Sequence, residues 1–168
     1  MDKLTPRERS DNMRRIRSKG MKPELDVRRL VHGLGYRYRL HVRSLPGKPD
    51  LVFRLRRKVI LVHGCFWHQH PNRRCKIVRR PKSNKTYWTR KLKNNAARDL
   101  KHLAALRKDG WRVLVIWECQ TANLATLAER ITTFLGSAKT SKSGASHYQV
   151  SSRRRATGRG LSDVRRVR

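Results

Sequence analysis

Residues 59–75 read Val-Ile-Leu-Val-His-Gly-Cys-Phe-Trp-His-Gln-His-Pro-Asn-Arg-Arg-Cys. The four apolar residues that begin this stretch predict a buried strand, so the polar residues after them are expected where that strand ends. Two of the chain's three cysteines and three of its seven histidines fall within residues 63–75. Such a concentration of metal-ligating side chains at a strand end predicts a functional site there.

Four side chains in or near this stretch are expected to form a tetrahedral zinc site. Thiolate and imidazole donors suit zinc, and the expected ligands are Cys65, His70, Cys75 and, farther along the chain, Cys119. His63 and His68 are then left beside the metal, next to the aromatic pair Phe66-Trp67. The alternative is a zinc-stabilised loop in which these two histidines only form hydrogen bonds.

The composition predicts a globular protein that binds a polyanion. The 168 residues carry 43 Lys and Arg against 11 Asp and Glu, a formal net charge of +32, which points to nucleic acid first. A histone-like protein would share this balance, so the charge predicts a partner class and no activity. No apolar run approaches the roughly 20 residues that cross a bilayer. Three cysteines without an export signal favour a reducing cytoplasm, with association to the nucleoid when DNA is bound.

The hydrophobic pattern predicts an α/β fold with one folded domain, residues 1–136. Helices are expected over about 5–19, 23–34, 84–108 and 123–135, and strands over 36–42, 51–53, 59–62 and 111–117. The strands 51–53 and 59–62 are expected to pair as a hairpin, and 111–117 to be a central strand covered on both faces. Residues 137–168 contain nine Lys or Arg against Asp163 alone, which predicts a disordered basic tail.

Asp50 stands immediately before the buried strand 51–53. A lone acid in that position is costly unless it is paired or bound to a cation. The predicted hairpin places it near His63, and His68 follows. A carboxylate that binds Mg²⁺ and a histidine of near-neutral pKa together supply what phosphodiester cleavage requires. Glu24 lies in the first turn of an early helix, where an acid is usually an exposed residue that complements the helix dipole.

The chain between Asp50 and Asp99 contains no acid, whereas residues 54–98 contain 15 Lys and Arg. Tyr87 and Trp88 lie within this basic span. Basic residues interleaved with aromatic rings hold phosphates while the rings stack on bases or wedge between them. The alternative is a solvated basic face with Trp88 packed in the core. Together with the Asp50 group, the pattern favours a nuclease.

Five motifs, in chain order, resemble the very short patch repair (Vsr) endonucleases over most of the chain. They are Leu-Pro-Gly-Lys-Pro-Asp at 45–50, His-Gly-Cys-Phe-Trp-His at 63–68, Tyr-Trp at 87–88, Asn95 with Arg98-Asp99, and residues 110–119 ending in Trp-Glu-Cys. The resemblance implies a restriction-endonuclease-like mixed sheet flanked by helices, with a structural zinc site. It also implies Mg²⁺-dependent nicking 5′ to the thymine of T:G mismatches that arise when 5-methylcytosine is deaminated.

The resemblance further implies roles for single residues. Asp50 matches the Mg²⁺-binding carboxylate, His68 the histidine that assists hydrolysis, His63 a second active-site histidine, and Glu24 an acid near the site. The zinc ligands implied are Cys65, His70, Cys75 and Cys119. The DNA contacts implied are an aromatic wedge of Phe66, Trp67 and Trp88, a minor-groove approach by Met13, and contacts of Lys91 and Asn95 with the mismatched pair. The protein is expected to be a monomer that binds mismatched duplex DNA and mismatch-repair proteins. It is not expected to bind a membrane.

Three features depart from the family pattern. Val62 stands where the best-known members have threonine, so only its backbone carbonyl is expected to bind Mg²⁺. The spacing between His70 and Cys75 is longer, and the basic tail has no counterpart. Two other functions are therefore kept: a restriction-type nuclease that acts on paired DNA, and a noncatalytic zinc-containing DNA-binding protein.

Overall fold

The computed structural model describes residues 5, 7, 8, 11, 20–78, 81 and 83–138. Met13, most of the first expected helix, and residues 139–168 of the expected tail lie outside this part. The start of that helix is confirmed at Thr5, whose backbone N–H and hydroxyl donate to the Glu8 carboxylate at 2.7 and 2.8 Å. The Glu8 N–H donates back to the Thr5 hydroxyl at 3.3 Å. This reciprocal pair is a capping box.

Among the described residues, four strands form a mixed sheet in the order β1-β2-β3-β4. Their bounds are Arg39–Leu40, Leu51–Phe53, Lys58–His63 and Arg112–Trp117. The predicted hairpin is confirmed: β2 and β3 are antiparallel, with Leu51 opposite Ile60. A short 3-10 turn, η1 (Arg54–Arg56), joins them. β1 is antiparallel to β2 and much shorter than the strand expected over residues 36–42.

β4 is parallel to β3, with His63 opposite Trp117. The expectation that it is a central strand is wrong, because within the part of the chain that the structure describes β4 lies at the edge of the sheet. Its apolar sequence is explained by coverage of both faces. Leu114 and Ile116 belong to one buried cluster, whereas Val113 and Val115 pack against another.

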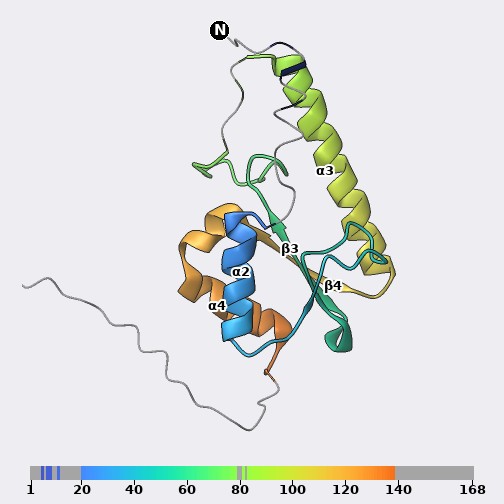
Figure 1. Cartoon of the computed structure of the whole chain (residues 1–168), viewed down its shortest axis with the longest axis vertical. Coiled ribbons are helices and arrows are strands. Elements are labelled where there is room, and N and C mark those ends of the chain that lie inside the picture. Colours follow the sequence, from blue (N-terminus) through green and yellow to red (C-terminus); the bar gives the residue numbers. More distant parts are fainter. Residues whose placement is uncertain are drawn as a thin grey trace, which may run out of the picture.

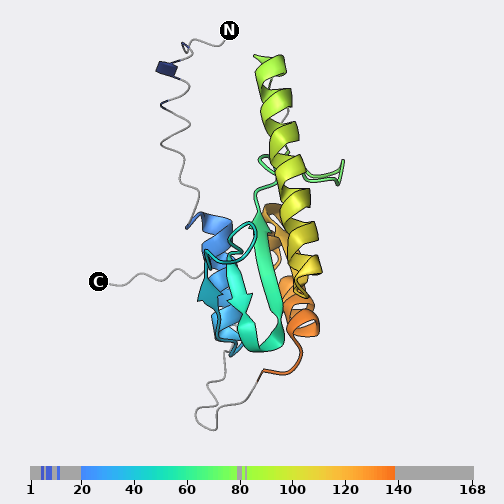
Figure 2. The ribbon, with the colours of Figure 1, turned by 90° about the vertical axis from the view of Figure 1, so that its right-hand side faces the viewer.

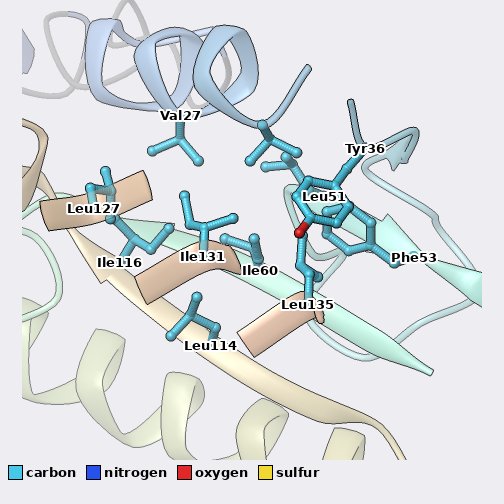
Figure 3. Close-up of a cluster of buried hydrophobic side chains, with 11 residues drawn as sticks. Val27, Tyr36, Leu51, Phe53, Ile60, Leu114, Ile116, Leu127, Ile131 and Leu135 are labelled. Carbon is cyan, nitrogen blue, oxygen red and sulfur yellow. The ribbon is translucent and has the colours of Figure 1, made fainter. Parts of the chain in front are cut away.

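Helices cover the two faces of the sheet. Figure 1 shows α2 (Lys22–Gly33) and α4 (Leu124–Leu135) on one side of β3 and β4, and α3 (Lys85–Lys108) on the other. α2 and α4 contribute to the larger cluster, drawn in Figure 3, which contains Val27, Ile60, Ile116 and Ile131. Leu106 of α3 packs with Val59 and Leu61 in the second cluster. The apolar run of β3 is therefore buried on both faces, as its sequence predicts.

α3 is the longest element in the described part of the chain, and Figure 2 shows its first half running past the end of the sheet. This overhang brings its polar residues beside the loop that follows β3. An η2 turn (Glu118–Ala122) follows β4. α4 then starts at its predicted cap, because the Asn123 Oδ1 accepts the Thr126 N–H at 3.1 Å. No helix among the described residues is long and apolar enough to cross a membrane.

Replacing Ile131 by alanine is expected to lower the free energy of unfolding by about 2–5 kcal/mol, because the side chain is fully buried between α4 and the sheet. Urea denaturation followed by circular dichroism measures the loss. The control is Leu124→Ala on the same helix, where the side chain is 46% exposed and a change within about 0.5 kcal/mol is expected. Equal losses in the two variants would contradict the assigned core.

Candidate active site

A cavity of about 780 Å³ opens where β3 ends. Eight residues singled out from the sequence line it: Glu24, Asp50, Val62, His63, Trp67, His68, Lys91 and Asn95. They come from α2, from the residue just before β2, from the end of β3, from the following turn and from α3. Ligand sites in open α/β sheets commonly lie at the carboxyl ends of strands, and the cavity has that location.

The hairpin fixes the position of Asp50 just before the start of β2. The Val62 N–H donates to its Oδ2 at 2.7 Å, which joins the start of β2 to the end of β3. Burial raises the pKa of Asp50 to about 6, although the Val62 hydrogen bond opposes this. The nearby Glu24 carboxylate raises the pKa further, and the positive charge of Arg28 lowers it. A carboxylate in this environment favours a nearby cation.

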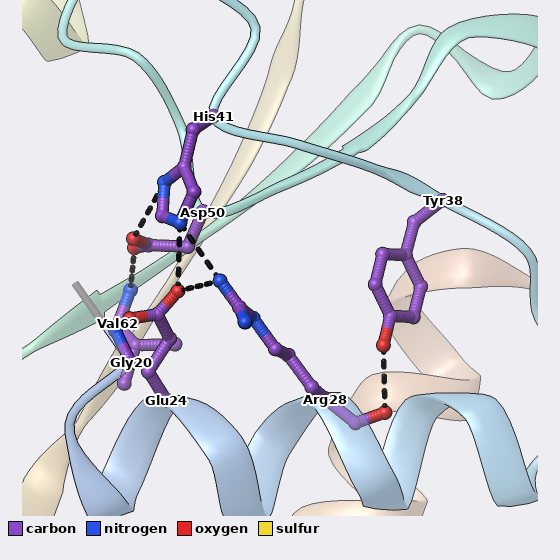
Figure 4. A network of polar contacts seen from close by, with 7 residues as sticks. All are labelled: Gly20, Glu24, Arg28, Tyr38, His41, Asp50 and Val62. Carbon is purple, nitrogen blue, oxygen red and sulfur yellow. Dashed lines mark hydrogen bonds and ion pairs between the residues drawn. The ribbon is translucent and has the colours of Figure 1, made fainter.

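Glu24 is buried, at 5% exposure, so the alternative of an exposed helix-start residue is wrong. Figure 4 shows it between Arg28 and His41. Its Oε2 accepts the Gly20 N–H at 2.6 Å, and its Oε1 lies 3.0 Å from the His41 Nε2. The Nδ1 of His41 lies 3.8 Å from the Asp50 Oδ1, so this imidazole stands between the two carboxylates.

His63 and His68 stack on one another, with ring centroids 4.0 Å apart. The Nδ1 of His68 lies 2.6 Å from the Asp99 Oδ2. Burial lowers the pKa of His63 to about 4, and the charge of His68 adds to the effect. Burial of Asp99 acts to raise its pKa, but the hydrogen bond and charge of His68 outweigh it and lower the pKa overall. His68 is thus the histidine held by an ionised acid, and His63 is kept neutral.

The four expected zinc ligands lie together. One atom each from Cys65, His70, Cys75 and Cys119 falls within 4.8 Å of all the others. The His70 Nδ1 is 3.8 Å from the Cys65 Sγ and 3.7 Å from the Cys119 Sγ. Ligand atoms about 2.0–2.3 Å from zinc at tetrahedral angles lie about 3.3–3.8 Å apart. The donor set and spacing fit a closed zinc site, and Cys75 lies with the other three residues across the longer loop.

The thiols respond differently to their surroundings. Burial raises the pKa of Cys65 to about 12 and also raises that of Cys119. A hydrogen bond with His70 lowers the pKa of Cys75 to about 6. Cys65 also anchors the turn that contains His68, because its carbonyl accepts the His70 N–H at 3.0 Å and its N–H donates to Glu118 at 3.1 Å.

The aromatic residues form a group beside the cavity. The Phe66 ring lies 5.0 Å from Trp67 and 5.6 Å from Trp88, and Trp88 lies 5.3 Å from Tyr87. Trp88 is half-buried and belongs to neither buried cluster, so the alternative that packs it in the core is wrong. The Asn95 Nδ2 donates to the Trp67 carbonyl at 3.3 Å, which ties this group to α3.

Comparison with known proteins assigns the family. The family model described as "DNA mismatch endonuclease Vsr" matches residues 1–76. The type II nicking enzyme V.XorIIP of Xanthomonas oryzae is 48% identical over 134 residues, covering 80% of this chain and 96% of that protein. The DNA mismatch endonuclease Vsr of Escherichia coli is 40% identical over 118 residues, covering 70% of this chain and 72% of that protein. The chain belongs to the Vsr family. It is accordingly an endonuclease of DNA repair, and nicking is the activity its relatives support.

The structure of this Vsr family member adds three residues that sequence reasoning did not place in the site: Arg28, His41 and Asp99. His41 has no local signal, because its partners Glu24 and Asp50 lie on other segments of the chain. Arg28 had a signal, since it follows Glu24 by four residues on the same helix. Asp99 had a signal, because it is the first acid after a long basic stretch and lies one helical turn beyond Asn95. Met13, expected at the minor groove, lies outside the described residues.

Replacing Asp99 by asparagine is expected to lower the nicking rate at saturating DNA about 10- to 100-fold. The amide loses the charge that orients His68, and general acid–base catalysis contributes about 10²–10⁴ in total. Single-turnover nicking measures the rate, and DNA affinity should change little. The control is Asp109→Asn, the same change at an exposed residue just after α3. An Asp99→Asn variant as fast as the control would exclude a role for this contact.

Proposed function

We propose that the protein nicks double-stranded DNA 5′ to the thymine of a T:G mismatch, by Mg²⁺-dependent hydrolysis. The observation that carries the proposal is that one cavity is lined by Asp50, His68 and Trp67. A cation-binding carboxylate, a proton-transferring histidine and a ring able to contact a base are thereby within reach of one nucleotide. Family membership supports the same substrate class.

Asp50 and the Val62 backbone carbonyl would hold the magnesium ion. Burial raises the pKa of Asp50, so its ionised form would be stabilised strongly by a bound cation. This is the observation by which Asp50 fits a magnesium ion. The Val62 side chain packs against the larger buried cluster, so this residue reaches the cavity through its backbone. The proposed contact with Mg²⁺ would be made by the backbone carbonyl and needs no threonine hydroxyl. When bound, Mg²⁺ supplies stabilisation of the charge that develops on the scissile phosphate.

His68 would move the proton. Its Nδ1–H donates to the Asp99 carboxylate, which leaves Nε2 available to take a proton from the attacking water or return one to the leaving oxygen. His63 stacks against His68, and burial keeps it neutral, so it packs against the His68 ring without placing a positive charge beside it. Glu24 would act by holding His41 beside Asp50.

The aromatic group would open the duplex at the mismatch. Unstacking a base step costs roughly a few kcal/mol, and least at a mismatch, so a wedge of rings selects weakened steps. Phe66, Trp67 and Trp88 form this wedge, with Lys91 and Asn95 on the adjoining face of α3. The excess of Lys and Arg supplies phosphate attraction that does not depend on sequence.

A structural zinc ion would be held by Cys65, His70, Cys75 and Cys119, which fit it by donor type and spacing. Cys65 and His70 bracket the turn that contains Trp67 and His68. The ion would therefore fix the position of a wedge residue and of the proton-transferring histidine together.

Purified protein with Mg²⁺ is expected to nick a T:G duplex and leave the matched T:A duplex intact, and Asp50→Ala should lower the rate at least 10³-fold, on the order of a lost catalytic group. Strand-specific labels on both strands locate the cut. The control Glu129→Ala, an exposed acid on α4, should retain the wild-type rate.

Equal cutting of both duplexes would favour the restriction-type nuclease and reject mismatch recognition. Tight, salt-sensitive DNA binding without a cut under any divalent metal would instead favour the noncatalytic alternative.

The zinc content of the purified chain is expected to be one ion, and His70→Ala should remove most of it because three ligands bind zinc far more weakly than four. Mass spectrometry of the metal measures the content, and His32→Ala, an exposed histidine on α2, is the control. The same measurement on Cys75→Ser tests the ligand across the longer loop. Full zinc retention in that variant would exclude Cys75 as a zinc ligand.

A further inference from the structure

Trp117, the last residue of β4, contacts two histidines that belong to different groups. Its ring stacks on the ring of His70, with centroids 4.4 Å apart and planes 27° apart. It also meets the His63 ring edge to face, at 5.3 Å and 79°. His70 belongs to the cysteine and histidine cluster, and His63 stacks on His68. The four rings therefore form one continuous series of contacts, the ring chain, which runs from His70 through Trp117 and His63 to His68.

The Trp117 side chain has no place in the core or in the wall of the cavity. Among the described residues it belongs to neither buried cluster, and it is not one of those that line the cavity. It is half-buried, and its ring lies against the imidazoles of His63 and His70. The position of this large ring is therefore explained by what it does to the two histidines.

The backbone fixes Trp117 from two sides. His63 lies directly opposite it in the parallel pairing of β3 with β4, so the two side chains leave the same face of the sheet. The Trp117 N–H donates to the Gln120 Oε1 at 3.0 Å. Arg130 of α4 donates to the same oxygen at 2.7 Å and to the Val115 carbonyl at 3.1 Å. The end of β4 is thus tied to α4 as well as to β3, which gives the ring a rigid base.

His68 needs more than its hydrogen bond to be oriented. Its Nδ1 lies 2.6 Å from the Asp99 Oδ2. A hydrogen bond at one ring nitrogen fixes that atom but leaves the imidazole free to rotate about it. A second ring stacked on its face restricts this rotation, and His63 supplies that ring. Asp99 and the ring chain therefore restrain different motions of the same imidazole.

We propose that Trp117 is a positioning residue for nicking, which fixes the ring of His63 and, through it, the orientation of His68. The proposal rests on the proton-transferring role of His68 in the proposed function. Because Trp117 does not line the cavity, it acts through His63 and not on the DNA. Misplacing a catalytic group by about 1 Å lowers rates on the order of 10²-fold. Loss of the Trp117 ring should therefore slow the chemical step and leave DNA affinity unaltered.

The first test is single-turnover nicking of a T:G duplex by the full chain with Mg²⁺. Trp117→Leu should lower the rate at saturating DNA about 10- to 100-fold, with little change in affinity. Trp117→Phe keeps an aromatic ring against the imidazoles and should stay within about threefold of the unaltered rate. The matched control is Trp111→Leu, just before β4, where the side chain is buried in the second cluster. This control should lower stability and leave the rate of the folded chain unchanged.

A double variant tests whether Trp117 acts through His68. Trp117→Leu combined with Asp99→Asn should be little slower than the slower of the two single variants, because both changes disturb one imidazole. Losses that multiply would show that Trp117 acts elsewhere and would overturn the proposal.

A second readout does not depend on activity. The Nδ1 proton of His68 is followed by NMR of the zinc-loaded full chain with nitrogen-labelled histidine, without DNA, and is assigned by its loss in Asp99→Asn. Trp117→Leu should shift or broaden this signal, whereas Trp117→Phe and Trp111→Leu should leave it unchanged. Trp117→Leu should also keep the zinc content of the unaltered chain. Circular dichroism confirms that each variant is folded.

An unaltered rate or an unaltered His68 signal in folded Trp117→Leu would overturn the proposal. Loss of zinc from that variant would overturn it too, because the slower rate would then follow from the metal. If Asp99→Asn nicks as fast as the unaltered chain, the proposed role of His68 itself is rejected. The two failures are therefore distinct.

Discussion

The parallel pairing of β3 with β4 is the constraint on which the rest of the structure depends. It runs from Lys58 opposite Arg112 to His63 opposite Trp117, so both strands end at the same edge. Two residues beyond those ends stand Cys65 and Cys119, and the Cys119 N–H lies 3.4 Å from the Cys65 Sγ. A slip of one residue would turn every side chain of β3 to the opposite face. The same pairing therefore fixes the core and brings the cysteine ligands together.

Burial of the cavity accounts for how its charges are arranged. Charged groups removed from water need partners, and the acids of the cavity have partners of unequal strength. Glu24 has Arg28, Asp99 has His68 at 2.6 Å, and Asp50 has an imidazole at 3.8 Å. Of these three acids, the weakest pairing falls on the carboxylate that the hairpin holds beside the end of β3. Asp50 is thus, of the three, the acid at which an added cation gains most.

The parts of this structure that local sequence encodes were predictable, and the parts set by distant contacts were not. The apolar run of β3 and the spacing of α3 indicated buried elements because periodicity is local. The thiol and imidazole donors indicated one metal group because their chemistry limits what they bind. The edge position of β4 depends on what lies beside it in space, which its own residues do not encode. His41 was missed for the same reason, since Arg28 lies 13 residues away in the chain.

The turn after β3 places side chains with different proposed roles on one short motif. Cys65 belongs to the cysteine and histidine cluster, Trp67 lines the cavity and contacts the aromatic rings, and His68 reaches Asp99. Backbone hydrogen bonds from His68 to Gly64 and from His70 to Cys65 hold them as one unit. The extra residues between His70 and Cys75 follow this turn and are exposed. Loop length can therefore vary there, because a lengthened exposed loop costs little free energy and leaves Cys65, Trp67 and His68 in place.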